Sequence, residues 1–274
     1  MLRTVDELKD YAIHATDGDV GRVNDLYFDD AGWAIRYLVV ETGNWLLQRK
    51  VLISPIAIGK PDWENKTLPV NITKDQVKNS PDINTDKPVS RQHENDYLGY
   101  YGYPLYWDGG SMWGEGMYPG LTVPGVTPLG AAGGIVVDAS YQEALHKNDD
   151  SHLRSCKEVT SYHIHAIDGD IGHVSGMLID EQTWAIRYLI VDTSNWWLGH
   201  QVLIAPLWID QVQWPDARVT VKLTRQAVQN SIPYDRNVRM DRTQEVAMHE
   251  HYQREGYWER EQQAKNNDKF EPED

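Results

Sequence analysis

The chain has 274 residues, enough for two domains of ordinary size, and it carries 41 Asp and Glu residues against 26 Lys and Arg residues. The resulting formal charge of −15 opposes binding to RNA, DNA or an anionic membrane surface. The single cysteine, Cys156, excludes an intramolecular disulfide and a cysteine-based zinc site, and it favours a reducing, cytoplasmic setting. Charged residues recur every few positions after Met1, so we expect no secretory signal segment there.

The most informative feature is an internal repeat with a constant offset of 151 residues, as from His14 to His165. The stretch "HATDGDVGRV" from His14 recurs as "HAIDGDIGHV" from His165. Residues 17–55 pair without a gap with residues 168–206, and the register continues through Trp63 and Trp214. The sequence therefore predicts two copies of one domain.

The elements of the first copy follow one another closely. Asp17 and Gly18 mark a tight turn, and a strand is predicted over residues 20–28. After a turn at residues 30–32, segments rich in β-branched and aromatic residues predict strands over 33–41 and 50–54. A further strand is expected over 67–72. Thr73 then starts a short helix as its N-cap, and Thr224 does the same in the second copy.

Short strands joined by tight turns indicate an all-β fold of two tandem small antiparallel β-barrels. Each barrel is followed by a short helical appendage, one beginning at Ser90 and one at Asp241. Both appendages contain Arg followed three residues later by Glu, and both end in Gly-Tyr, with a small insertion expected in the second. The predicted boundaries are 1–103 for the first barrel domain, 104–152 for a flexible Gly/Pro-rich and aromatic linker, 153–258 for the second barrel domain, and 259–274 for a charged tail.

Residues 116–137 within the linker carry no charged side chain, which raises the question of a membrane span. Prolines and glycines in this stretch would leave backbone groups unpaired in lipid. We therefore expect no membrane span. The linker aromatics are candidates for docking on a partner or on the chain's own barrels: Tyr103, Tyr106, Trp107, Trp113 and Tyr118.

The ordered series of a "DGDxG" turn, a strand, an "AIRYLVV" strand and then "VLISP" or "VLIAP" resembles the PRC-barrel domain. The resemblance covers residues 5–105 and 155–258. That family includes the barrel of the photosynthetic reaction centre H subunit and the C-terminal domain of the bacterial ribosome-maturation factor. The resemblance implies a small all-β barrel that acts as an assembly or adaptor module, and it brings no catalytic residues and no cofactor.

The duplicated turn has two interpretations. His14, Asp17 and Asp19 offer an imidazole and two carboxylates, which suit several divalent metals. Asp-Gly-Asp is also what a tight turn requires, and the calcium-loop pattern is not met. We favour the turn and predict no metal site. The predicted turn-forming residues are Asp17, Gly18, Asp19, Asp168, Gly169 and Asp170.

Arginine and loop aromatics supply the candidate interaction residues. Arg36 and Arg187 interrupt apolar strands, and alternation predicts that they lie at the surface and pair with a nearby acid, although an anionic ligand is an alternative. The aromatic residues after the long strand fit either an interface anchor or packing over a barrel end. The candidates are Asn44, Trp45, Arg36, Asn195, Trp196, Trp197 and Arg187.

The sequence contains no nucleophile elbow and no phosphate-binding glycine loop, so we predict no enzyme activity and no cofactor. The leading hypothesis is a cytoplasmic adaptor or assembly protein that binds a protein partner or itself, with homo-oligomers allowed and direct nucleic-acid binding not expected. A first alternative is a sensor that binds a small ligand or metal at the turns. A second is a photosynthetic electron-transfer role associated with the reaction centre, which rests on the family resemblance alone.

Overall fold

The structure, a computed structural model, describes residues 1–81, 89–107, 152–193 and 200–261. The predicted linker beyond residue 107, its uncharged stretch, Asn195 to Trp197 and most of the charged tail lie outside these residues. Two compact units are present: residues 3–160 with 176–187, called the N-terminal unit below, and residues 1–2, 161–175 and 188–274, called the C-terminal unit. The units and the sequence repeats therefore have different boundaries.

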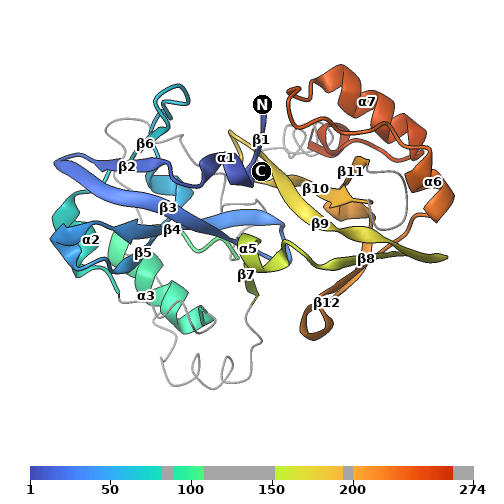
Figure 1. Ribbon diagram of the computed structural model, residues 1–274. Coiled ribbons are helices and arrows are strands. Elements are labelled where there is room, and N and C mark those ends of the chain that lie inside the picture. Colours follow the sequence, from blue (N-terminus) through green and yellow to red (C-terminus); the bar gives the residue numbers. More distant parts are fainter. Residues whose placement is uncertain (82–88, 108–151, 194–199, 262–274) are drawn as a thin grey trace, which may run out of the picture. The chain divides into compact units, whose positions relative to one another are not determined.

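The N-terminal unit is built on a sheet with strand order β5-β4-β3-β2-β6, and β7 also pairs with β3 (Figure 1). The pairs β2–β3, β3–β4 and β4–β5 are antiparallel, whereas β2 pairs with β6 in parallel, which the purely antiparallel prediction missed. The strands are β2 (Ala12–Ala15), β3 (Gly18–Asp29), β4 (Ala34–Thr42), β5 (Lys50–Ile53), β6 (Thr67–Pro69) and β7 (Leu153–Ser155). The helices are α1 (Val5–Leu8), α2 (Lys74–Asn79), α3 (Arg91–Tyr101) and α5 (Cys156–Val159), with 3-10 turns at Asn44–Leu46 and Pro55–Ala57.

The C-terminal unit contains most of a second sheet, with strand order β11-β10-β9-β8-β13-β12, and β1 (Leu2–Thr4) pairs with β9. The ends of β9 and β10 nearest their connecting turn, within residues 176–187, belong to the N-terminal unit. The strands are β8 (His163–Ala166), β9 (Gly169–Asp180), β10 (Ile186–Asp192), β11 (Gln201–Ile204), β12 (Ile209–Gln213) and β13 (Arg218–Val221). The helices are α6 (Arg225–Gln229) and α7 (Arg242–His251), with 3-10 turns at Pro206–Trp208 and Trp214–Asp216.

The predicted strands and helix starts are largely confirmed, because local sequence determines them. Thr73 caps α2 in a full capping box, and the Thr224 hydroxyl accepts from the amide of Ala227 at the start of α6. The closed barrels are not seen: among the described residues neither sheet closes on itself. In the N-terminal unit the edge strands β5 and β6 do not pair with each other as strands. The chain beyond β5 reaches β6 and the chain after it through the isolated bridges Asp62–Thr67 and Ile58–Val70.

An exchange of segments between the two repeats was not predicted. β7 comes from the second repeat but pairs with β3 of the first, and β1 of the first repeat pairs with β9 of the second. Near this exchange the equivalent residues Ala34 and Ala185 form a bridge. The Ile35 amide donates to the Trp184 carbonyl at 2.9 Å, and the equivalent bond from the Ile186 amide to the Trp33 carbonyl is 2.7 Å. The first repeat's fold is thus completed by the second repeat.

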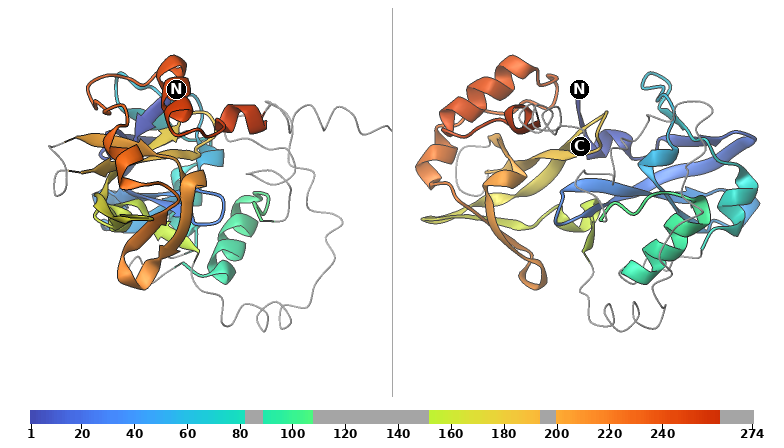
Figure 2. Two further views of the ribbon diagram at one scale, coloured as in Figure 1. Left: turned by 90° about the vertical axis from the view of Figure 1, so that its right-hand side faces the viewer. Right: turned by 180° about the vertical axis from the view of Figure 1, so that it is seen from behind.

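Helix α3 lies beside the strands of the N-terminal unit (Figures 1 and 2) and supplies part of its core. Tyr97 and Leu98 of α3 pack against Tyr37 and Val39 of β4, with Leu153 of β7 in the same cluster. Full burial of each such side chain contributes about 1.5–3 kcal/mol. Among the described residues, no helix is both long enough and apolar enough to cross a membrane.

Candidate functional site

The duplicated Asp-Gly-Asp turns hold the start of a helix in each repeat. The Asp17 carboxylate accepts from the Lys74 amide at 2.8 Å, and the Asp168 carboxylate accepts from the Arg225 amide at 2.7 Å. These amides belong to the first residues of α2 and α6, which have no partner within their own helix. The first aspartate of each turn therefore fixes the turn to a helix N-terminus.

The histidines before the turns pair with the second aspartate. His14 Nδ1 lies 2.5 Å from Asp19, and His165 Nδ1 lies 2.7 Å from Asp170. The bond to His165 lowers the pKa of the Asp170 carboxyl. Within the described ranges no group of three His, Cys, Asp or Glu residues is placed to hold a metal ion.

The last glycine of the "DGDxG" motif has a packing role. A Cβ atom on Gly21 would collide with the Glu41 carbonyl of β4, and one on Gly172 would collide with the Asp192 carbonyl of β10. Close approach of two strands thus requires glycine at this position in both repeats.

Arg36 and Arg187 are buried, at 3% and 9% exposure, so the prediction of a surface position is wrong. Arg36 does pair with an acid, because its guanidinium donates from Nε to Asp29 at 2.7 Å. Its guanidinium also lies 3.9 Å from the ring centre of Tyr106. Alternation failed here because the chain after α3 covers the face of the sheet that was expected to meet water. Arg187 Nη2 donates to Thr183 at 3.3 Å.

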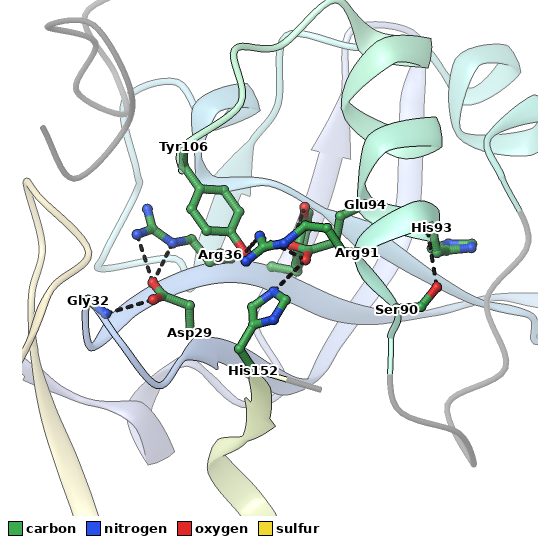
Figure 3. A network of polar contacts seen from close by, with 10 residues as sticks. Asp29, Gly32, Arg36, Ser90, Arg91, His93, Glu94, Tyr106 and His152 are labelled. Carbon is green, nitrogen blue, oxygen red and sulfur yellow. Dashed lines mark hydrogen bonds and ion pairs between the residues drawn. The ribbon is translucent and has the colours of Figure 1, made fainter. Parts of the chain in front are cut away.

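A buried carboxylate lies at the centre of the adjoining polar network (Figure 3). Glu94 of α3 is fully buried and accepts from the Tyr106 hydroxyl at 2.6 Å and the Tyr37 hydroxyl at 3.1 Å. Its other oxygen contacts His152 Nε2 at 2.9 Å and Arg91 Nη1 at 3.3 Å. We call these five residues the Glu94 cluster. In Figure 3 the His93 side chain points away from them, and its backbone amide donates to the Ser90 hydroxyl.

The C-terminal unit contains the equivalent cluster, here called the Glu245 cluster. Glu245 Oε1 accepts from the Tyr188 hydroxyl at 2.9 Å and from the Tyr257 hydroxyl at 3.0 Å, and Arg242 lies 3.0 Å from Oε2. His249 Nε2 lies 3.0 Å from the Tyr188 hydroxyl. Each of these residues except His249 lies 151 positions after its counterpart in the Glu94 cluster. The register therefore continues without the insertion expected in the second appendage.

Both clusters are suited to holding a helix on a sheet. A buried carboxylate is tolerated only when donors surround it, and here tyrosine hydroxyls and an arginine supply them. Burial, with Glu94 as the next contribution, raises the pKa of Tyr37 and Tyr106 well above the usual value, so both keep their hydrogens for donation. The clusters are buried and internally satisfied, which favours a structural role.

The loop between β4 and β5 combines a half-buried tryptophan with exposed residues. Trp45 is half-buried; its Nε1 donates to the Val20 carbonyl at 2.7 Å, and Lys74 Nζ lies 4.4 Å from its ring centre. Asn44 is exposed, and Leu47 is 93% exposed. Leu47 and Gln48 both have positive φ values, 53° and 58°.

An open cleft of about 500 Å³ adjoins this loop. Trp45 and Gln48 line it together with the backbone of β3 around Gly21. Its exposed carboxylates are Asp10, Asp19 and Glu41, with Arg22 as the basic residue among the lining groups.

The structure places the predicted candidates in three different settings. Trp45 donates to the Val20 carbonyl of β3 and lines the cleft, and its role as an interface anchor stays a prediction. Arg36 lies in the buried network, away from that role. Asn195, Trp196 and Trp197 lie outside the described residues. Of the linker aromatics, Tyr106 is 7% exposed and docks on the chain itself.

Sequence reasoning missed Leu47 and both buried clusters. The repeated Arg-x-x-Glu of the appendages marked Arg91, Glu94, Arg242 and Glu245, but nothing in the spacing showed that the tyrosines converge on the glutamates. For Leu47, an apolar residue within a polar loop was the available signal.

A family model for the PRC-barrel domain matches residues 3–77. This part of the chain is thus similar to the PRC-barrel domain. The match covers β2 to β6 of the first repeat and ends within α2, so it includes Tyr37 of the Glu94 cluster but not Glu94 itself. No curated protein matches the chain.

Proposed function

We propose that this PRC-barrel protein is a non-enzymatic assembly module that binds a protein partner through the β4–β5 loop and its adjoining cleft. The observation that carries the proposal is Leu47, a leucine that is 93% exposed and lies in the chain between Trp45 and Gln48, which both line an open cleft. A single exposed leucine is ordinary, but this one is held in a left-handed conformation that disfavours residues other than glycine.

The conformation of the β4–β5 loop supports a role for Leu47 in contacting a partner. Left-handed residues other than glycine cost on the order of 1–3 kcal/mol each and persist when their surroundings fix them. Trp45 provides such an anchor through its bond to Val20 and its contact with Lys74. The loop is thus fixed at Trp45 and free to present Leu47.

The cleft indicates the chemistry of the partner. Exposed Asp10, Asp19 and Glu41 surround its polar part, whereas Trp45 provides apolar surface. A partner segment with an apolar anchor and flanking basic residues fits this surface, because complementary charges favour encounter and correct orientation.

Affinity purification from the source cell tests the proposal with two matched leucine variants. Leu47→Asp is compared with Leu207→Asp, which changes another exposed leucine, 52% exposed, in the C-terminal unit. We expect a protein retained by the wild type and by Leu207→Asp to be lost from Leu47→Asp. Retention of the same proteins by all three chains would contradict the proposal.

A further inference from the structure

The edge of β3 carries a second interaction surface, distinct from the cleft. β3 pairs with β7 through Tyr27–Ser155, Phe28–Arg154 and Asp29–Leu153. Residues 152–159, called the second-repeat segment, form β7 and α5 and follow this edge. An uncovered strand edge presents unpaired backbone groups, so the segment completes the sheet.

Side chains hold the second-repeat segment at several points. The Ser155 hydroxyl donates to Asp25 at 2.5 Å, and the Lys157 amide donates to the other Asp25 oxygen at 3.2 Å. Arg154 donates to Asp30 at 3.0 Å. His152 reaches Glu94 at 2.9 Å, and the Leu153 side chain is 6% exposed.

The chain contains a homologous segment in residues 1–8. The second-repeat segment reads "HLRSCKEV" and residues 1–8 read "MLRTVDEL". The shared Leu-Arg pair supplies the buried leucine and the arginine: Arg3 donates to Glu181 at 2.8 Å, as Arg154 does to Asp30. The two segments differ most in chemistry at His152, where residues 1–8 have Met1, and at Lys157, where they have Asp6.

These differences match differences at the acceptor strands. Asp25 of β3 corresponds to Gly176 of β9, so only the first acceptor carries a buried carboxylate at this position. An aspartate in place of Lys157 would bring a like charge toward Asp25. A methionine in place of His152 cannot donate to Glu94. We infer that the β3 edge is a recognition site for a strand-and-helix segment, and that Asp25 and Glu94 select the second-repeat segment over its homologue, residues 1–8.

Selection of this kind determines which segment pairs with which acceptor strand. Each repeat offers one segment and one acceptor strand, and similar segments on a duplicated chain invite wrong pairing. The carboxylates at the first acceptor disfavour the wrong segment by repulsion and by loss of a hydrogen bond. The two halves of the chain are therefore each other's specific partners.

The test uses the full chain with a protease site inserted within residues 108–151 and cut after folding. The dissociation constant of the two fragments is measured by dilution of a fluorescently labelled fragment. We expect the wild-type fragments to stay associated at micromolar concentration. We expect His152→Met/Lys157→Asp to weaken their association at least tenfold.

Matched controls separate recognition from general damage. Ser155→Thr/Cys156→Val introduces two of the three remaining differences of residues 1–8, both conservative, and we expect affinity within threefold of wild type. Asp25→Asn removes the proposed repulsion and should restore part of the affinity of the chain that carries Lys157→Asp. Circular dichroism of the uncut chains checks folding. If His152→Met/Lys157→Asp fails to fold, Asp25→Asn and His152→Leu are measured singly in its place, and each is expected to weaken the association, because leucine cannot donate to Glu94.

Two results would overturn the inference. Equal affinities for His152→Met/Lys157→Asp and the conservative control would show that the edge does not discriminate between the segments. Separation of the wild-type fragments after cleavage would show that the segment is held by the covalent connection alone.

Discussion

The Glu94 and Glu245 clusters have the same arrangement of glutamate, tyrosines and arginine, but their histidines come from different positions. In both, two tyrosines and an arginine surround a buried glutamate, and every equivalent residue is offset by 151 positions. His152 of the Glu94 cluster precedes β7 and so comes from the other repeat. His249 belongs to α7 itself, at the position occupied by Leu98 in the first repeat.

The different histidines distinguish two functions of the clusters: attachment of a helix to its sheet, and contact with the exchanged segment. The tyrosines and glutamate attach the appended helix to its sheet in both repeats, so the attachment needs no contribution from outside the repeat. The histidine is variable, and in the N-terminal unit it also ties the second-repeat segment to α3. The Glu94 cluster therefore joins attachment of the helix to recognition of the exchanged segment.

The largest predicted effect is the loss of either central carboxylate. Glu94→Ala removes the acceptor for the Tyr37 and Tyr106 hydroxyls, and Glu245→Ala does the same for Tyr188 and Tyr257. Removal of one partner from a buried charged network costs about 3–5 kcal/mol. Denaturant titration monitored separately on each unit by hydrogen exchange measures the loss, which should be confined to the unit that carries the substitution. A loss below about 1 kcal/mol would show that the clusters do not hold the helices.

A smaller loss of stability is expected when the tyrosine hydroxyl of either cluster is removed, and its size should differ between Tyr188 and Tyr37. The Tyr188 hydroxyl lies near both Glu245 and His249, whereas the Tyr37 hydroxyl contacts Glu94 at 3.1 Å. Leaving a buried polar partner unsatisfied costs about 1–3 kcal/mol. We expect Tyr188→Phe to destabilise its unit more than Tyr37→Phe destabilises the other, as measured by the same titration. The reverse order would show that the contact between the Tyr188 hydroxyl and His249 does not stabilise the C-terminal unit.

The turns provide a smaller effect that should be equal in both repeats. Asp17→Ala and Asp168→Ala remove the acceptor at a helix N-terminus, which is typically worth about 1 kcal/mol. Asp19→Ala is the matched control, because this exposed carboxylate contacts only a partly exposed histidine and should change stability by less than about 0.5 kcal/mol. Unfolding midpoints measure both. Equal losses for Asp17→Ala and Asp19→Ala would contradict the helix-start role.

The smallest difference is a pH response confined to the C-terminal unit. Burial lowers the pKa of His249 below its usual value of 6.5. The unfolded chain therefore takes up a proton first, so stability is full above pH 6.5 and falls as the pH drops through 6.5 toward the lowered pKa. His249→Leu, which introduces the residue found at position 98, should flatten this response between pH 8 and 5. An unchanged slope in the variant would assign the response to another group.

Much of the fold follows from local sequence, whereas the partners of its segments do not. The repeat, the strands around Val20 and Ile35, and the cap at Thr73 depend on neighbouring residues and were predicted. Arg36 was placed at the surface because alternation assumes that one face meets water, and Tyr106 covers that face. The exchange was missed because strand periodicity does not show which edge a strand pairs with. The loop was found through Trp45, but its exposed contact, Leu47, depends on a backbone conformation that composition does not reveal.

Amide hydrogen exchange measures whether a segment of the second repeat completes the fold of the first. The Asp30 amide donates to the His152 carbonyl at 2.9 Å, and the Lys157 amide donates to Asp25. We expect both amides to be protected nearly as well as that of Val23 within the sheet. Leu153→Asp should remove this protection, while that of Val23 persists. Rapid exchange of Asp30 and Lys157 in the wild-type chain would contradict it.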